Sequence, residues 1–106
     1  MPKYMFHGAY TAAGAAGLLK EGGSARAEAI RQLAASVGGT VESNYWAFGT
    51  DDFYIIVDLP DSHAAAAVSL AVSASGAVRT TTSELLSAAD VDDIVRRRVD
   101  YRAPGA

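Results

Sequence analysis

The sequence predicts an α+β domain in which helices pack on one face of a four-stranded antiparallel sheet. Short segments rich in aromatic and β-branched residues alternate between apolar and polar side chains, as strands do. Segments with apolar residues at helical spacing separate them, and glycines mark most of the boundaries. The chain of 106 residues has the length of one domain, which we expect to span residues 1–99 with a flexible tail over 100–106.

The N-terminal part predicts a strand followed by a short helix. Residues 3–10 are rich in aromatics and alternate, so they predict a strand. Thr11 is suited to begin a helix, which Gly14 and Gly17 weaken and the Gly22-Gly23 pair ends.

A second helix is predicted from Ser24, a suitable N-cap residue, to the Gly38-Gly39 pair, because glycine commonly follows a helix terminus. The apolar residues at helical spacing within it are Ile30, Leu33, Ala34 and Val37.

Residues 40–48 and 53–59 predict a β-hairpin, because the segment between them has turn composition. Strict alternation in the first strand of this hairpin places Asn44, Trp46 and Phe48 on one face. The opposite face then receives Val41, Ser43, Tyr45 and Ala47.

The C-terminal part predicts a helix over residues 62–75 with Asp61 as its cap, a strand over 77–82, and a last helix over 87–98. Asp90 in the first turn and the Arg96-Arg97-Arg98 run in the last turn of that helix complement its dipole. The complete order of elements is the split βαβ arrangement of a ferredoxin-like fold.

One face of such a sheet has no cover from its own chain. The face away from the helices is expected to carry Met5, His7, Asn44, Trp46, Phe48, Tyr54, Ile56, Arg79 and Thr81. An exposed apolar patch of this kind is typical of an association surface, so we expect a homodimer or larger homo-oligomer with sheets back to back, as an α/β barrel. The space between the sheets is either a cavity for a small-molecule ligand or a dry interface.

Several segments resemble the GYD-domain family of small bacterial and archaeal proteins over about four-fifths of the chain. They are Tyr4–Tyr10, Lys20–Arg26, Phe48-Gly49, Asp52, Ile56–Asp61 and Leu70–Thr80. The naming Gly-x-Tyr-Asp motif is altered, because Gly49-Thr50-Asp51-Asp52 has Asp51 where the family has tyrosine. The resemblance implies a relative of the dimeric α/β-barrel proteins, which include cofactor-independent monooxygenases, isomerases, polyketide cyclases and haem-using enzymes.

The candidate site residues are those expected on the uncovered sheet face. In one hypothesis the protein binds an aromatic or carbonyl-containing metabolite, with His7 as acid or base and with Asn44 and Arg79 holding an oxyanion. The apolar wall of that site is formed by Met5, Trp46, Phe48, Tyr54 and Ile56. In the alternative hypothesis the protein is a non-catalytic accessory or assembly module whose sheet face is only an oligomer interface.

Composition excludes several classes of protein. The chain has no cysteine, so thiol catalysis, disulfides and zinc–thiolate sites are ruled out. The net charge of −3 argues against a nucleic-acid partner. We expect no cofactor, no bound metal and no membrane partner, and a cytoplasmic location, because the sequence shows no metal-ligand spacing, no secretory signal and no long apolar run.

Overall fold

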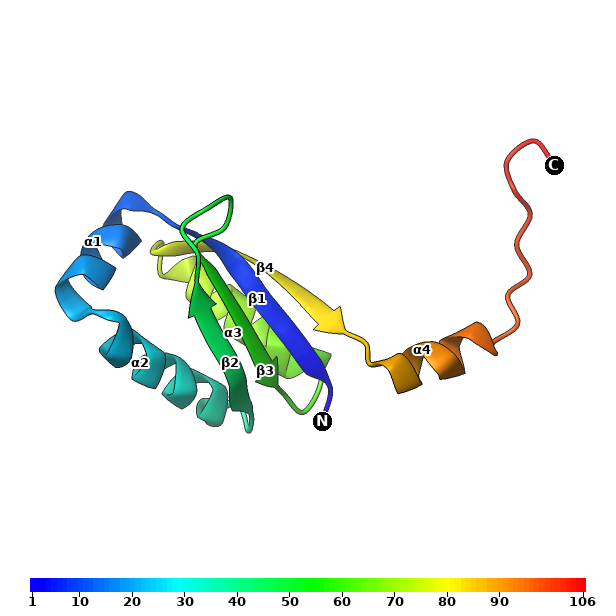
Figure 1. The fold of residues 1–106 in the computed structure, drawn as a ribbon, viewed down its shortest axis with the longest axis horizontal. Helices are drawn as coiled ribbons and strands as arrows, with labels where there is room; N and C mark the ends of the chain where they lie inside the picture. The colour runs from blue at the N-terminus through cyan, green and yellow to red at the C-terminus, as the bar shows by residue number, and fades with distance from the viewer.

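In the computed structural model, which describes residues 1–106, the chain forms one antiparallel sheet with helices on one side of it (Figure 1). The strands cross the sheet in the order β2-β3-β1-β4 and are β1 (Lys3–Tyr10), β2 (Thr40–Trp46), β3 (Phe53–Asp58) and β4 (Val78–Leu85). The helices are α1 (Ala12–Glu21), α2 (Gly23–Ser36), α3 (Ser62–Ala74) and α4 (Ala88–Val95). This confirms the predicted ferredoxin-like fold with its C-terminal helix.

Local signals set most helix boundaries. The Thr11 hydroxyl accepts a hydrogen bond from the Gly14 N–H at 3.2 Å, and an Asp61 carboxylate oxygen accepts one from the Ala64 N–H at 2.9 Å, so both predicted caps are confirmed. The predicted cap at Ser24 is wrong, because α2 already begins at Gly23 and no side chain caps it. Gly22 joins α1 to α2 with a φ of 83°, a backbone conformation that favours glycine.

Three other boundaries differ from the predicted ones. The second strand ends at Trp46, two residues earlier than expected, which leaves Phe48 in the loop that follows. The last strand continues to Leu85 along its pairing with β1, where 82 was expected. The last helix ends at Val95, ahead of the arginine run.

The core lies between the sheet and helices α2 and α3. Alternate residues of the two central strands face the helices and are buried there: Tyr4 and Phe6 of β1, and Phe53, Ile55 and Val57 of β3. The helices contribute Ile30, Ala65 and Val68, and Leu59 after β3 completes the cluster. The buried residues therefore gather on one face of the sheet, as the alternation predicts.

A β-bulge in β2 reverses the faces of that strand. The pairing of β2 with β3 shifts by one residue between Val41 and Ser43, and beyond this point Asn44 lies opposite Ile55 and Trp46 opposite Phe53. Because directly paired residues share a face, Asn44 and Trp46 point toward the helices. The prediction that placed them on the uncovered face is wrong, and Ser43 and Tyr45 lie there instead.

The face without helices is called the open face below. The strand residues on it are Lys3, Met5, His7, Ala9, Thr40, Ser43, Tyr45, Tyr54, Ile56, Asp58, Arg79, Thr81, Ser83 and Leu85. The predictions for Met5, His7, Tyr54, Ile56, Arg79 and Thr81 on this face are confirmed by the pairing.

Helix α4 and the residues after it extend away from the sheet (Figure 1). The Ser87 hydroxyl and the Asp90 carboxylate form a capping box at its start, and hydrogen bonds with Ser87 lower the pKa of Asp90 below its ordinary value. No helix of the structure has both the length and the apolar character that crossing a membrane requires.

Candidate functional site

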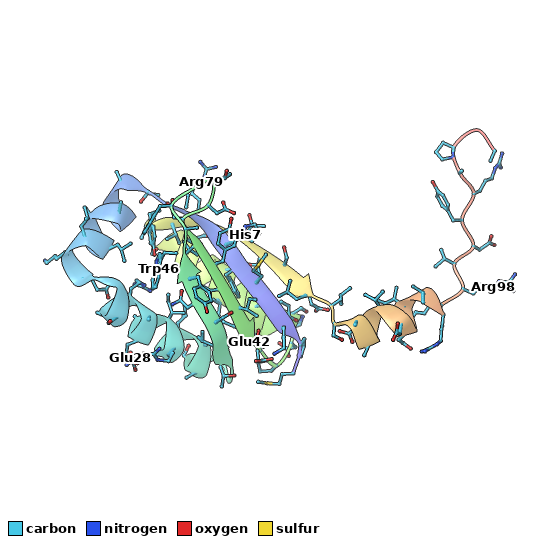
Figure 2. All side chains as sticks on the ribbon, in the orientation of Figure 1. His7, Glu28, Glu42, Trp46, Arg79 and Arg98 are labelled. Atoms are coloured by element: carbon cyan, nitrogen blue, oxygen red, sulfur yellow. The ribbon has the colours of Figure 1, made fainter.

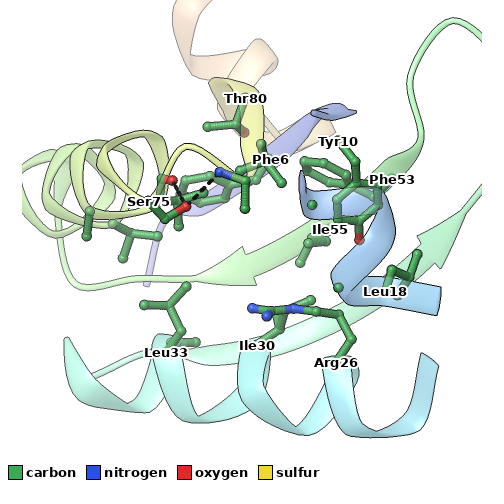
Figure 3. A pocket seen from close by; sticks show the side chains of 18 of the residues that line it. Phe6, Tyr10, Leu18, Arg26, Ile30, Leu33, Phe53, Ile55, Ser75 and Thr80 are labelled. Carbon is green, nitrogen blue, oxygen red and sulfur yellow. Dashed lines mark hydrogen bonds between the residues drawn. The ribbon is translucent and has the colours of Figure 1, made fainter. Parts of the chain in front are cut away.

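A pocket opens between the sheet and the three helices that cover it (Figure 3). Helix α2 packs on β2 and helix α3 packs on β4, so the two edges of the sheet hold the helices and the central strands lie between them. Phe6, Phe53 and Ile55 of these central strands form the floor of the pocket. Its volume is about 420 Å³. We call this space the helix-side pocket.

Small side chains create the room in the helix-side pocket. Gly14 and Gly17 of α1, Ala34 of α2 and Ala71 of α3 all line it. Larger side chains at Gly17, Ala34 or Ala71 would reach into the space and fill it, as they do in most protein cores, whereas Gly14 has no room for a side chain beside the Ala77 carbonyl. The small residues of these helices therefore leave a hollow above the sheet.

Five polar or charged side chains line the helix-side pocket, and two of them, Ser75 and Thr80, donate their hydroxyls to backbone carbonyls of the chain. The Tyr10 hydroxyl accepts a hydrogen bond from the Trp46 indole N–H at 2.9 Å, and the Tyr10 ring packs against Phe53 at 5.4 Å between ring centroids. Arg26 of α2 extends across the pocket, as Figure 3 shows. Its guanidinium lies 3.8 Å from a Glu21 carboxylate oxygen, which is too long for a hydrogen bond.

Trp46 therefore has a different place from the one predicted. It does not line the pocket, and its indole N–H donates a hydrogen bond to the Tyr10 hydroxyl. A phenol oxygen that accepts one hydrogen bond keeps its own proton to donate. The Tyr10 O–H is thus available to an acceptor inside the pocket.

A second group of polar side chains lies at the opposite face of the sheet. The His7 Nδ1 lies 2.7 Å from an Asp51 carboxylate oxygen, and the His7 ring stacks on the Tyr54 ring with an interplanar angle of 7°. When Nδ1 carries the proton and donates it to Asp51, Nε2 is left free to accept another. This is the arrangement that general-base chemistry requires of a histidine.

Asp51, the partner of His7, was not among the site residues predicted from the sequence. The loop between β2 and β3 folds back onto β1, because the Asp52 N–H donates to the Gly8 carbonyl at 2.7 Å and the Asp52 carboxylate accepts from the Tyr10 N–H at 2.9 Å. This places the neighbouring Asp51 beside His7. The signal in the sequence was the Asp51-Asp52 pair at the position where the family motif has tyrosine and aspartate.

The predicted site residues are consequently divided between the two faces. His7 and Arg79 share the open face, towards the same end of the sheet (Figure 2), whereas Asn44 faces the helices. Both polar atoms of the Asn44 amide are buried without a hydrogen-bond partner in the chain. An oxyanion site shared by Asn44 and Arg79 is therefore not formed within one chain.

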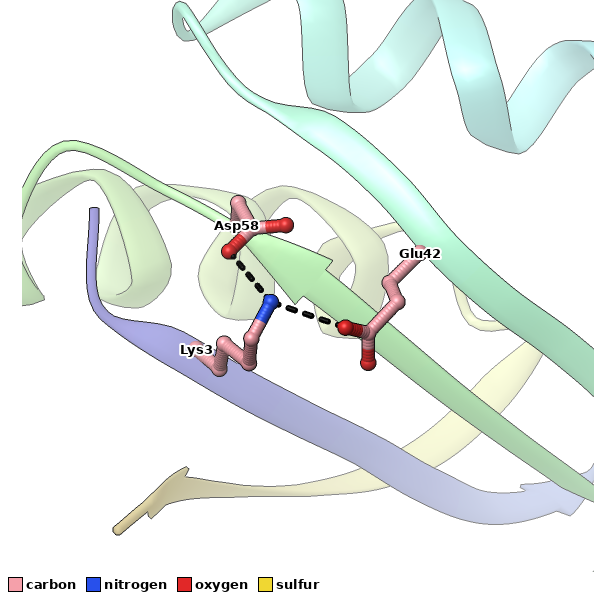
Figure 4. A network of polar contacts seen from close by, with 3 residues as sticks. All are labelled: Lys3, Glu42 and Asp58. Carbon is pink, nitrogen blue, oxygen red and sulfur yellow. Dashed lines mark hydrogen bonds and ion pairs between the residues drawn. The ribbon is translucent and has the colours of Figure 1, made fainter. Parts of the chain in front are cut away.

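The opposite end of the open face carries a charged network (Figure 4). The Lys3 ammonium lies 2.8 Å from carboxylate oxygens of both Asp58 and Glu42. The hydrogen bond to Asp58 is the main reason why the pKa of Lys3 lies above its ordinary value, and the hydrogen bond to Glu42 contributes as well. No group of three or more histidine, cysteine, aspartate or glutamate side chains lies close enough together to hold a metal ion.

Comparison with known proteins identifies the family. No curated protein and no solved structure matches the chain. The sequence model of the GYD domain matches residues 4–95, which include all the strands and helices described above except Lys3, the first residue of β1. The chain therefore belongs to the GYD-domain family.

Proposed function

We propose that this protein binds a small, mainly apolar molecule with an aromatic ring or a carbonyl group in the helix-side pocket. The observation that carries the proposal is a space of about 420 Å³ with an apolar floor and few polar groups. Binding sites for small molecules typically enclose about 300–1,000 Å³ and combine apolar walls with a few well-placed polar groups. The pocket is partly open to solvent, so a ligand that binds there would also remove exposed apolar side chains from water.

Binding is better supported than catalysis. Two of the three residues proposed for catalysis, His7 and Arg79, lie on the open face, on the other side of the sheet from the pocket. Asn44, the third, does not line the pocket. Cofactor-independent chemistry at His7 remains a prediction, and it needs a substrate on the open face.

Filling the helix-side pocket is expected to abolish binding. The probes are 2-naphthoate and its neutral analogue 2-acetylnaphthalene, titrated calorimetrically, because a fused ring pair matches the apolar floor. In Ala71→Trp the indole occupies the pocket, so affinity for either probe should fall by at least about tenfold, as when a well-fitting apolar group is excluded from its site.

The matched control is Leu70→Trp, on the same helix but with a residue that is 72% exposed and does not line the pocket. It should bind both probes as the wild type does. Equal affinities in Ala71→Trp and the wild type would place the probes elsewhere and overturn the proposal.

We also propose that the open face pairs with the open face of a second copy, as in the assembly-module hypothesis. Tyr45 and Tyr54 lie opposite each other across β2 and β3 and are 70% and 38% exposed, and Phe48 in the adjoining loop is 65% exposed. Aromatic side chains gathered on one face are typical of an interface. A sheet-to-sheet homodimer would cover them.

A charge placed in this aromatic cluster is expected to yield a monomer. Tyr54→Arg would bury a guanidinium without a partner in both copies, so the dissociation constant should rise at least about a hundredfold. Sedimentation velocity at micromolar concentration measures the change. Leu70→Arg on the helix side is the control and should leave the assembly intact, whereas a monomeric wild type would refute the pairing.

A further inference from the structure

We propose that the helix-side pocket selects an anionic ligand, namely a planar aromatic carboxylate or phenolate whose charged oxygen binds Arg26 and Tyr10. This inference rests on the proposed function and names the chemical class of the ligand. It follows from which charged and hydrogen-bonding groups reach the pocket and from how few partners they have.

Arg26 is the residue that makes the pocket prefer an anionic ligand. Glu21 and Arg26 are the charged residues that line the pocket. The Arg26 guanidinium lies 3.8 Å from the Glu21 carboxylate, and its N–H groups form no hydrogen bond within the chain. A guanidinium has five N–H donors in a fixed planar array that matches a carboxylate, so these donors are free for a ligand.

Glu21 does not block this site. Its side chain is about one-third exposed, and Glu21 is the last residue of α1, next to the Gly22 that connects α1 to α2. An ion pair at this separation and exposure is weak. A ligand carboxylate that makes two short hydrogen bonds to Arg26 therefore displaces Glu21 toward solvent.

Tyr10 supplies the second contact. Its hydroxyl is held by the Trp46 N–H and points into the pocket on the side of Arg26 (Figure 3). Because the Trp46 N–H occupies an acceptor position of this oxygen, the Tyr10 proton is directed to another acceptor. The aromatic body of the ligand then lies over Phe53 and Ile55, where the pocket is apolar.

The contrast between the two naphthalene probes tests this selection. In the wild type 2-naphthoate should bind about tenfold more tightly than 2-acetylnaphthalene, the scale of a partly exposed charge-assisted hydrogen bond. Arg26→Gln should lower the affinity for 2-naphthoate to about that for the ketone, so that the preference is lost. Glu21→Gln removes the competing carboxylate and should tighten naphthoate binding alone.

The other possible results distinguish a wrong assignment of Arg26 from a wrong proposed function. If both probes bind with equal affinity in the wild type, or if the preference survives Arg26→Gln, the pocket binds small molecules but the assignment of Arg26 is wrong. If neither probe binds, the proposed function itself fails and this inference fails with it. The Arg26 side chain makes no hydrogen bond within the chain, and circular dichroism of Arg26→Gln verifies that the variant folds.

Discussion

Replacing Gly14 by alanine is expected to lower the free energy of unfolding by about 2–3 kcal/mol, the cost of forcing a methyl group into a close-packed contact. Replacing Gly17 by alanine, less than one turn further along the same helix, should raise it by about 0.5–1 kcal/mol. The two substitutions add the same atoms to the same element, so the difference between them reports only their surroundings.

The expected cost at Gly14 arises from the close approach of α1 to the start of β4. A Cβ at Gly14 would lie 1.9 Å from the Ala77 carbonyl oxygen. That carbonyl cannot easily move away, because it accepts a hydrogen bond from the Thr11 N–H at 3.0 Å. The Thr11 hydroxyl also donates to the Gly76 carbonyl at 2.8 Å, so two hydrogen bonds from Thr11 hold the backbone of Gly76 and Ala77 in place.

Gly17 has the opposite environment. A Cβ at Gly17 meets no heavy atom within 4 Å, so alanine there gains helix propensity without a clash. Urea unfolding of both variants measures the two changes, with equal m-values as the sign that the folded states are comparable. A Gly14→Ala variant as stable as the wild type would show that α1 does not lie this close to β4.

The fold could be predicted from the sequence because its signals are local. Alternation specified the central strands, where Phe53, Ile55 and Val57 face one way and Tyr54 and Ile56 the other. Caps at Thr11 and Asp61 marked helix starts through short hydrogen bonds within the same segment.

The orientation of β2 could not be predicted in the same way. A bulge adds one residue to one strand only, and the segment with Glu42 and Ser43 has no glycine or proline to mark it. One extra residue reverses every side chain beyond it, which moved Asn44 and Trp46 to the helix side. The prediction for these two residues was wrong for this single reason.

The candidate site also depended on distances that no local pattern contains. The helix-side pocket exists because α2 and α3 hold opposite edges of the sheet, and their separation is a property of the whole fold. The approach of Asp51 to His7 likewise depends on how Asp52 ties its loop to β1. The residue types were visible in the sequence, whereas their pairing required the structure.

Replacing Asn44 by leucine is expected to raise the free energy of unfolding by about 1–2 kcal/mol, because a buried amide without partners is costly. The amide nitrogen and oxygen of Asn44 both have no hydrogen-bond partner in the chain, and its strand neighbour Ile55 is buried in the core. Leucine has the same branching as asparagine, with two methyl groups in place of the amide oxygen and nitrogen, and needs no hydrogen-bond partner. In a domain of this size the midpoint of thermal unfolding should rise by roughly 4–8 °C per kcal/mol.

The neighbouring Ser43 provides the control, since the bulge turns it to the open face. Ser43→Leu buries nothing in the core and should change the free energy of unfolding by less than about 0.5 kcal/mol. Because Asn44 does not line the pocket, Asn44→Leu should also keep its affinity for 2-naphthoate. A large loss of stability in Asn44→Leu would mean that the amide is hydrogen-bonded in solution, whereas a large loss of affinity would return Asn44, which lies on the same face of the sheet as the pocket, to the binding site.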